Sequence, residues 1–183
     1  MKVSDVFLQR KTNKKLSITI RTLTSSDITP QYCSWLNDKE TNQYLESRFI
    51  DWNMKSLLDY FHEKNESELM LAIVNDDTGA HIGNMKISCI DNNHHRAEVG
   101  IIIGDKRFWG KGIATTAIGI VADYCFNTLN FHKLTAGAYA ENLASINAFM
   151  NNGFIIEGKR KEHVLTPSGW SDVVLLGKIK SQQ

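Results

Sequence analysis

The pattern of apolar and polar residues switches between two periods along the chain. Apolar residues recur every three or four positions, as in a helix, from Ser25-Ser26-Asp27 to Leu36, after Asp51, after Gly112 and after Asn142. They alternate, or form short runs as in strands, over 17–23, 69–74, 81–90, 96–103, 134–138, 154–164 and 173–179. The predicted order is therefore β-α-α-β-β-β-α-β-α-β-β.

Clusters of turn-forming residues separate these segments. Asp76-Asp77-Thr78-Gly79 predicts a hairpin turn, and Asn151-Asn152-Gly153 is typical of the end of a helix. With neither an internal repeat nor a linker, the pattern predicts a single domain over 17–180, an α/β sandwich on a mixed sheet. A leader over 1–16 precedes it. Its basic residues are expected to be solvated; they are Arg10, Lys11, Lys14 and Lys15.

Composition narrows the class of protein. The chain has 183 residues, 42% of them hydrophobic, and a net charge of +1, which argues against a nucleic-acid-binding face and against attraction to anionic lipid. Its first ten residues lack the apolar run of a secretory signal. The longest apolar-rich stretch, 113–126, is too short and interrupted to span a bilayer. We therefore expect a cytoplasmic protein, monomer or homodimer, with neither nucleic acid nor a membrane as a partner.

The cysteines offer no reactive or metal-binding motif. Cys33, Cys89 and Cys125 are spaced too widely for a CxxC pair or a Cys/His cluster. We expect all three to be buried small apolar residues in a reducing compartment, and we expect no metal site. The chemistry must therefore come from other residues.

The segment Arg107-Phe108-Trp109-Gly110-Lys111-Gly112-Ile113-Ala114 lies between a predicted strand and a predicted helix. The first N–H groups of a helix have no partner within the helix and, together with the helix dipole, attract an anion. Gly110 and Gly112 permit positive φ and a close approach of the backbone to a ligand. Because Arg107 and Lys111 add positive charge, this loop is predicted to bind a pyrophosphate.

Two common phosphate-binding motifs do not describe this loop. The chain has no GxxxxGK[ST] sequence, and no serine or threonine follows Lys111-Gly112 to hold Mg²⁺. The spacing R-x-x-G-x-G also differs from the dinucleotide fingerprint G-x-G-x-x-G. A glycine turn that merely connects strand and helix is the alternative interpretation.

In its context, the loop resembles the acetyl-CoA pyrophosphate loop of the GNAT superfamily of N-acetyltransferases. Glu141–Ser145 and Asn152-Gly153-Phe154 stand where that superfamily carries its second conserved helix and the Gly-Phe that follows. Ala97–Gly100, Trp109–Ala114 and Asn142–Ser145 are similar to the branch that contains the ribosomal-protein N-terminal acetyltransferases. The resemblance covers 17–180. It implies transfer of acetyl from acetyl-CoA to a primary amine, on a mostly antiparallel sheet of about seven strands with helices on both faces and a splayed central strand pair.

The resemblance also implies where acetyl-CoA binds. The pantetheine arm lies in the gap beside the splayed strand and pairs with its backbone as an added strand would. Gly100 suits a bulge or a close approach in that strand. Asn142 is expected to bind the pantetheine, to cap its helix, or both. The expected CoA-binding residues are Ile101, Ile102, Ile103, Arg107, Trp109, Gly110, Lys111, Gly112, Ile113, Ala114, Asn142 and Phe149, with no metal.

The reaction implied by the resemblance is direct attack of a neutral amine on the thioester, which calls for a base, an oxyanion donor and an acid. The backbone of Ile102 and Ile103 is the candidate oxyanion donor. Alternation puts Glu98 beside the cleft as the candidate base, unless it is a structural carboxylate at a strand end. His94 and His95, in the preceding turn, are further candidates, although turn histidines are usually only solvated.

The acid is where the chain departs from the superfamily. Phe149 occupies a position at which many members carry a tyrosine that protonates the thiolate, and a phenyl ring cannot donate a proton. Ser145 is the candidate acid instead, since residues four apart share a helix face. The alternatives are that Ser145 is an ordinary helix-surface serine and that the thiolate leaves without a protein acid.

The acceptor is expected to bind to the elements before the strand meander. Trp35–Asp38 followed by Tyr44–Phe49 is similar to enzymes that acetylate amino groups on nucleotide-activated sugars. The candidate substrate-binding residues are Trp35, Tyr44, Arg48 and Phe49, with aromatic rings for a nucleobase and a guanidinium for a phosphate. The alternative is that the aromatic residues are core. A protein N-terminus and a small-molecule amine are competing acceptors, and a non-catalytic acyl-CoA sensor is the alternative from another class.

Overall fold

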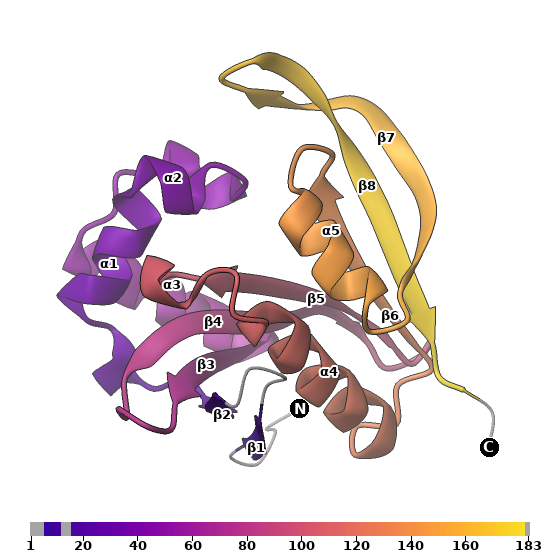
Figure 1. Cartoon of the computed structure of the whole chain (residues 1–183), viewed down its shortest axis with the longest axis horizontal. Coiled ribbons are helices and arrows are strands. Elements are labelled where there is room, and N and C mark those ends of the chain that lie inside the picture. Colours follow the sequence, from indigo (N-terminus) through magenta and orange to yellow (C-terminus); the bar gives the residue numbers. More distant parts are fainter. Residues whose placement is uncertain (1–5, 12–15, 182–183) are drawn as a thin grey trace.

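The structure is a computed structural model, and it describes residues 6–11 and 16–181. Its main elements follow the predicted order, with one additional strand at the start and one additional short helix, Lys39–Asn42 (Figure 1). The strands are β1 (Phe7–Lys11), β2 (Ser17–Thr22), β3 (Leu69–Asn75), β4 (His81–Asp91), β5 (Arg96–Ile103), β6 (Lys133–Tyr139), β7 (Ile155–Thr166) and β8 (Gly169–Ile179). The helices are α1 (Pro30–Asn37), α2 (Lys39–Asn42), α3 (Met54–Ser67), α4 (Ile113–Asn127) and α5 (Leu143–Met150), with 3₁₀ turns η1 (Ser25–Asp27), η2 (Glu46–Phe49) and η3 (Lys106–Phe108).

Within the described residues, one sheet holds eight strands in the order β1-β2-β3-β4-β5-β6-β8-β7. Neighbouring strands are antiparallel except for β5 and β6, which are parallel. The parallel pair needs a crossover connection, which α4 supplies. The expected α/β fold with a mostly antiparallel sheet is confirmed.

Part of the predicted leader belongs to this sheet. β1 pairs antiparallel with β2 from Phe7↔Arg21 to Lys11↔Ser17. The Arg10 guanidinium lies 2.7 Å from the Asp123 carboxylate of α4. Residues 7–11 are therefore not a leader separate from the domain, because the edge of β2 pairs with their backbone groups, although the Arg10 side chain is exposed as expected. Lys14 and Lys15 lie outside the described residues.

The first helix begins later than expected. Ser25–Asp27 forms the separate turn η1, and α1 begins at Pro30. The Thr29 side chain accepts a 3.2 Å hydrogen bond from the N–H of Tyr32. Thr29-Pro30 is thus the start signal, since a threonine cap followed by proline at the first helical position suits a helix N-terminus.

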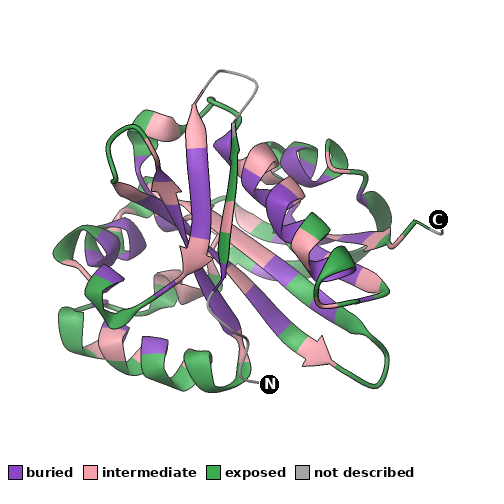
Figure 2. Ribbon diagram, turned by 90° about the horizontal axis from the view of Figure 1, so that it is seen from below, coloured by how far each residue is buried: buried purple, intermediate pink, exposed green. Residues whose placement is uncertain are grey.

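Helices cover both faces of the sheet (Figure 1). On one face α4 and α5 bury side chains such as Ile118 and Phe149, and on the other α1 and α3 bury Trp35 and Leu57. Buried residues accordingly lie between the layers in Figure 2. The alternating side chains of β5 therefore face two different surroundings, with Val99 on the α4 side and Ile102 on the α1–α3 side.

Two of the three cysteines are buried as expected. Cys33 and Cys125 lie in the core, whereas Cys89 is exposed on β4 with φ of 50°. The prediction is wrong for Cys89 because the pairing of β4 becomes irregular between Ser88 and Asp91, which interrupts the alternation of inward and outward positions. None of the helices in 6–11 and 16–181 combines the length and the apolar character of a bilayer span.

Candidate active site

The central strands β5 and β6 separate part-way along their length. Their parallel pairing runs from Arg96↔Lys133 to Glu98↔Thr135, although β5 continues to Ile103 and β6 to Tyr139. On their outer sides β5 stays paired with β4, and β6 with β8. A gap therefore opens between β5 and β6 beyond Glu98.

The direction of the backbone groups along β5 decides which residues face this gap. The carbonyl of Ile102 points at β4, where a Cβ on Gly83 would lie 2.4 Å from it. The carbonyl of Ile103 accepts a 2.7 Å hydrogen bond from the Trp109 indole instead. Because successive residues of a strand turn their N–H and C=O groups to opposite sides, Ile101 faces the gap together with Ile103, whereas Ile102 faces β4.

The loop after β5 has the backbone conformation expected of its glycines. The φ angle is 66° at Gly110 and 79° at Gly112, which confirms the prediction of positive φ at both. A Cβ at either position would have no heavy atom within 4 Å. The surface of the loop is therefore open to a ligand.

Asp105 organises the start of the same loop. Its buried carboxylate accepts hydrogen bonds from the backbone N–H of Arg107 at 3.0 Å and from the guanidinium of that residue at 2.6 Å. These hydrogen bonds hold the pKa of Asp105 below its usual range in spite of its burial. The Arg107 side chain remains 76% exposed, and the exposed Lys111 ammonium lies 5.4 Å from the Phe108 ring. Both cationic groups therefore lie at the surface near the start of α4.

The N-terminus of α4 differs from those of the other long helices. The side chains of Thr29, Asn53 and Asn142 cap α1, α3 and α5. Gly112 stands at the N-cap of α4, and no described side chain supplies a cap there. The first-turn N–H groups of α4 are thus left for an anion, which the helix dipole also favours.

A cavity of about 280 Å³ lies on the α1–α3 side of the sheet and reaches β5 beside the gap. The described residues that line it are Tyr32, Leu36, Tyr44, Leu45, Glu46, Ser47, Trp52, Tyr60, Met70, Asn84, Met85, Lys86, Gly100, Ile101 and Ile102. Aromatic rings form much of the wall, and the Trp52 and Tyr60 rings meet edge to face at 5.3 Å. Small-molecule sites are typically apolar cavities with a few polar groups and volumes of ~300–1,000 Å³. This cavity has that character and lies near the lower end of that range of volumes.

Glu46 and Lys86 are the charged groups among the described lining residues. The Lys86 ammonium lies 3.1 Å from the Glu68 carboxylate. Glu46 is exposed and accepts a short hydrogen bond from the hydroxyl of Tyr139. Burial and this hydrogen bond raise the pKa of Tyr139, so its hydroxyl stays protonated at neutral pH. Glu46 is therefore the carboxylate of the cavity with which a cationic ligand can pair.

The guanidinium of Arg48 is already engaged within the protein. It donates to the Tyr139 hydroxyl at 2.5 Å, to the Leu45 carbonyl at 2.8 Å and to the Leu165 carbonyl at 2.6 Å. It also lies 4.2 Å from the centre of the Phe49 ring. A substrate phosphate would have to displace these contacts to bind Arg48.

Of the four predicted substrate-binding residues, Tyr44 lines the cavity and the other three do not. Trp35 is buried in the core, where its ring occupies the space that a side chain on Gly104 would need. Phe49 is 69% exposed. The aromatic residues of this segment are thus divided between core, surface and cavity.

The candidate bases lie at different distances from the gap. Glu98 is exposed and stands where the pairing of β5 with β6 ends. By alternation it shares a face with Gly100 and Ile102, which line the cavity. His94 and His95 lie in the turn before β5, beyond the part of the strands that remains paired. Glu98 is therefore the nearest of the three to the gap.

Helix α5 carries the other predicted residues. Asn142 caps the helix by accepting a 3.1 Å hydrogen bond from the N–H of Ser145, as expected for a cap. Ser145 is half-buried in the first turn. Phe149 is 2% exposed and packs edge to face on Phe154 at 5.0 Å, so its ring belongs to the core. Within the described residues, no three His, Cys, Asp or Glu side chains come together as metal ligands would.

Two residues in or beside the cavity are not predicted by the sequence patterns. Asn84 interrupts an apolar stretch of β4, and a polar residue at such a position is a usable signal. Tyr139 follows the alternation of β6, but nothing in the sequence pairs it with Glu46, from which 93 positions separate it.

Comparison with known proteins gives a consistent set of relatives. The model of the acetyltransferase (GNAT) domain matches residues 17–155. The uncharacterized N-acetyltransferase p20 of Bacillus licheniformis is 27% identical over 82% of this chain and 86% of its own length. The spermidine N(1)-acetyltransferase of Escherichia coli (strain K12) is 35% identical over 54% of this chain and 51% of its own length.

Solved structures share the fold. Spermidine N-acetyltransferase from Vibrio cholerae, in complex with CoA and spermine, matches with a TM-score of 0.79 at 24% identity over 89% of this chain and 95% of that chain. A GNAT family acetyltransferase from Bacillus anthracis matches with a TM-score of 0.81 at 15% identity over 97% and 100% of the two chains. At these identities the likeness concerns the architecture alone.

Proposed function

We propose, given that the chain belongs to the GNAT family of acetyl-CoA-dependent N-acetyltransferases, that it acetylates a small primary amine bound in the aromatic cavity. One observation carries this proposal. Gly100, Ile101 and Ile102 of β5 line the cavity, and the backbone groups of Ile101 also face the gap between β5 and β6. An acyl donor in the gap and an amine in the cavity therefore meet at the same stretch of backbone.

The residues of this chain fit acetyl-CoA as the acyl donor. The pyrophosphate binds at the uncapped start of α4, beside the charges of Arg107 and Lys111. The pantetheine pairs with the gap-facing backbone of Ile101 and Ile103, as an added strand would. Ile102, predicted from the sequence as a third partner, turns its carbonyl towards β4 and contributes its side chain to the cavity. Asn142 remains the proposed contact from α5.

The proposed reaction is a direct transfer. The neutral amine nitrogen attacks the thioester carbon, a C–N bond forms and the C–S bond breaks, so that CoA leaves as a thiolate. A gap-facing N–H of Ile101 or Ile103 stabilises the negative charge on the carbonyl oxygen. Glu98 accepts the amine proton, directly or through water. Ser145 donates a proton to the thiolate as it takes one from a water molecule, so that CoA is released as the thiol.

A monocationic amine suits the walls of the cavity. Aromatic faces attract an ammonium group, and Tyr44, Trp52 and Tyr60 supply them. Glu46 supplies one carboxylate. A polyamine such as spermidine, the substrate in the names of several relatives, would bring further positive charge towards Lys86 and find no second carboxylate among the described lining residues.

An amino-sugar nucleotide fits this site less well. Its phosphate was expected to bind Arg48, whose guanidinium is held by Tyr139 and by two backbone carbonyls. A peptide N-terminus and a non-catalytic acyl-CoA sensor have no specific observation in their favour. Assays with each class of acceptor distinguish these alternatives from a small amine.

The test is release of CoA thiol from acetyl-CoA with four kinds of acceptor: short alkylamines, spermidine, a nucleotide-linked amino sugar and a short peptide with a free N-terminus. We expect the alkylamines to have the highest kcat/KM. A higher value with any other class would contradict the proposed acceptor. Binding of CoA without transfer to any amine would indicate a sensor.

A cavity-filling variant locates the acceptor. A Cβ at Gly100 would have no heavy atom within 4 Å, and the residue lines the cavity, so the side chain of Gly100→Leu is expected to occupy cavity space. We expect the KM for the amine to rise about ten-fold or more, with CoA affinity little changed. Gly158 of β7 has equally open surroundings outside the cavity, and Gly158→Leu is the matched control. An unchanged KM in Gly100→Leu would contradict the cavity as the acceptor site.

A further inference from the structure

Asn84 is a buried polar residue in the wall of the cavity. Its side chain is 4% exposed, and in the β4–β5 ladder it stands opposite Ile102. Its amide nitrogen, Nδ2, has no hydrogen-bond partner among the residues that the structure describes. Buried amide groups normally have a partner, so the wall of the cavity holds a donor that no described residue satisfies.

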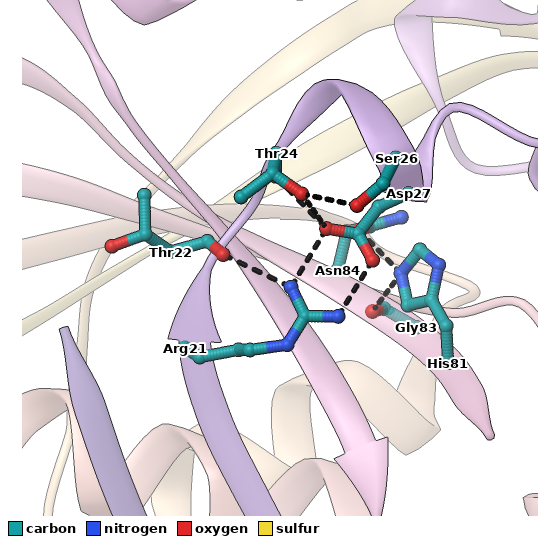
Figure 3. A network of polar contacts seen from close by, with 8 residues as sticks. All are labelled: Arg21, Thr22, Thr24, Ser26, Asp27, His81, Gly83 and Asn84. Carbon is teal, nitrogen blue, oxygen red and sulfur yellow. Dashed lines mark hydrogen bonds and ion pairs between the residues drawn. The ribbon is translucent and has the colours of Figure 1, made fainter. Parts of the chain in front are cut away.

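His81 fixes which way the Asn84 amide points (Figure 3). The Nε2 of His81 lies 3.0 Å from the Gly83 carbonyl oxygen and 2.8 Å from Oδ1 of Asn84. A carbonyl oxygen can only accept, so Nε2 must carry the hydrogen. The acceptor of the Asn84 amide therefore faces His81, and its donor Nδ2 is turned away from the imidazole.

His81 is itself held firmly. Its ring meets Tyr32 edge to face at 5.8 Å and Trp35 at 5.1 Å. Burial lowers the pKa of His81, which keeps the imidazole neutral at pH 7 and preserves one tautomer. Figure 3 shows the ion pair of the partly exposed Arg21 with the buried Asp27 next to this imidazole. The amide of Asn84 is thus preset before any ligand arrives.

The charges near the cavity restrict what this donor can recognise. A carboxylate or phosphate on the substrate would lie in the same cavity as Glu46. The cations that could balance it are engaged, since Lys86 lies 3.1 Å from Glu68 and Arg48 binds Tyr139. An uncharged oxygen has neither problem, and it is the natural partner of an amide N–H.

We propose that Asn84 selects amines that carry an uncharged oxygen, as a hydroxyl, ether or amide carbonyl, by donating a hydrogen bond from Nδ2 to that oxygen. The inference rests on the proposed function and sharpens its substrate class to oxygen-bearing small amines. Glu46 and the aromatic rings bind the ammonium end of the substrate, and Nδ2 of Asn84 donates a hydrogen bond to its oxygen. His81 is a positioning residue, because it acts only through the orientation of the Asn84 amide.

The test compares amines that differ by one atom. Methoxyethylamine and butylamine have the same length, with an ether oxygen in place of a methylene group, and longer pairs extend the series. We expect at least one oxygen-bearing member to exceed its alkyl counterpart about ten-fold or more in kcat/KM, because a site with a buried donor penalises a ligand that leaves it unpaired. Equal values across every pair would overturn this inference while leaving the proposed function intact.

Variants assign the preference to Asn84. The measured quantity is the ratio of kcat/KM for an oxygen-bearing amine to kcat/KM for its alkyl counterpart. A general loss of protein stability lowers both values and leaves their ratio unchanged. Asn84→Leu should bring the ratio to about one, and so should Asn84→Asp, which keeps an acceptor for His81 but loses the donor. His81→Leu should lower the ratio, whereas His62→Leu, on the exposed side of α3, should not.

A ratio that survives in both Asn84 variants would overturn the assignment. CoA binding without transfer to any amine would contradict the proposed function, and this inference with it.

Discussion

The Arg48 guanidinium donates a 2.5 Å hydrogen bond to the hydroxyl of Tyr139, 91 positions further along the chain. The same hydroxyl donates to Glu46, and a second guanidinium nitrogen binds the Leu165 carbonyl at 2.6 Å. These contacts join η2 to β6 and to the β7–β8 hairpin, which extends beyond the helices in Figure 1. The carboxylate proposed to bind the amine is therefore positioned by residues from both halves of the chain.

Tyr139→Phe should weaken amine binding and spare acetyl-CoA. The change removes the tyrosine donor of Glu46 and one of the three acceptors described for the Arg48 guanidinium, and a hydrogen bond to a charged group contributes about 1.5–3 kcal/mol. We expect the KM for the amine to rise about ten-fold in steady-state kinetics at saturating acetyl-CoA. Tyr124→Phe on α4, a partly buried tyrosine outside the cavity, should change neither constant. Equal amine KM values in the two variants would contradict the role given to Tyr139.

Gly112→Ala should reduce affinity for CoA. A side chain at φ of 79° is strained and also projects into the open space where the pyrophosphate is proposed to bind. Gly79, in the β3–β4 turn at φ of 68°, has equally open surroundings, so Gly79→Ala imposes a similar strain far from the loop. We expect calorimetry to show a Kd for CoA raised about ten-fold or more in Gly112→Ala and unchanged in Gly79→Ala. A similar Kd in both variants would remove this loop from the CoA site.

Glu98→Gln should change the pH dependence of the chemical step. If the carboxylate takes the amine proton, its loss should slow turnover about 10²-fold at neutral pH, and less at high pH where more of the amine is already neutral. The pH–rate profile at saturating substrates measures this. Glu66→Gln is the control, because Glu66 is also an exposed carboxylate but lies on α3. A profile of unchanged shape in a folded Glu98→Gln protein would leave Glu98 with a structural role.

The Arg21–Asp27 pair should make stability depend on pH. Burial of Asp27 raises the pKa of its carboxyl, but hydrogen bonds from Arg21 and Thr24 outweigh that effect and lower the pKa to about 2. Because the folded value lies below the unfolded one, the pair stabilises the protein above about pH 4 and loses its contribution as the pH falls towards about 2. Its full contribution is about 2 kcal/mol.

Urea unfolding between acid and neutral pH measures this contribution. Asp27→Asn should be less stable than the parent at pH 7, and the difference should shrink as the pH falls below about 4. Asp59→Asn, which removes an exposed ion pair with Lys55, should have little effect at any pH. A stability difference for Asp27→Asn that stays constant with pH would contradict the assigned charge state.

The architecture followed from the sequence because it depends on local patterns. Alternation predicted the strands of the meander, and the glycines of the loop predicted positive φ at Gly110 and Gly112. β1 was missed because it is short and flanked by basic residues, and only the neighbouring edge of β2 makes it a strand. The intrinsic strand propensity of residues 7–11 does not indicate that the edge of another strand is free to pair with them.

The acceptor side was less predictable because it is assembled from distant segments. Aromatic residues near one another in sequence were all predicted to bind the substrate. The structure instead packs Trp35 into the core and leaves Phe49 at the surface. Two of the three groups that bind the Arg48 guanidinium come from β6 and β7, so its availability to a phosphate could not be judged from its neighbours in sequence alone. Gly100 was expected at a bulge or at a close approach of a ligand; the pairing of β4 and β5 is regular there, so there is no bulge, and the residue borders the cavity.

The central claim is that acetyl passes directly from CoA to a small amine held in the cavity. Its most direct test is a single-turnover experiment with excess enzyme, acetyl-CoA labelled in the acetyl group and methoxyethylamine as the acceptor. The account predicts that label appears on the amine at the rate at which CoA thiol is released, with none on the protein. Label that stays on CoA, becomes attached to the protein, or reaches spermidine or a sugar nucleotide but not the small amine would contradict it.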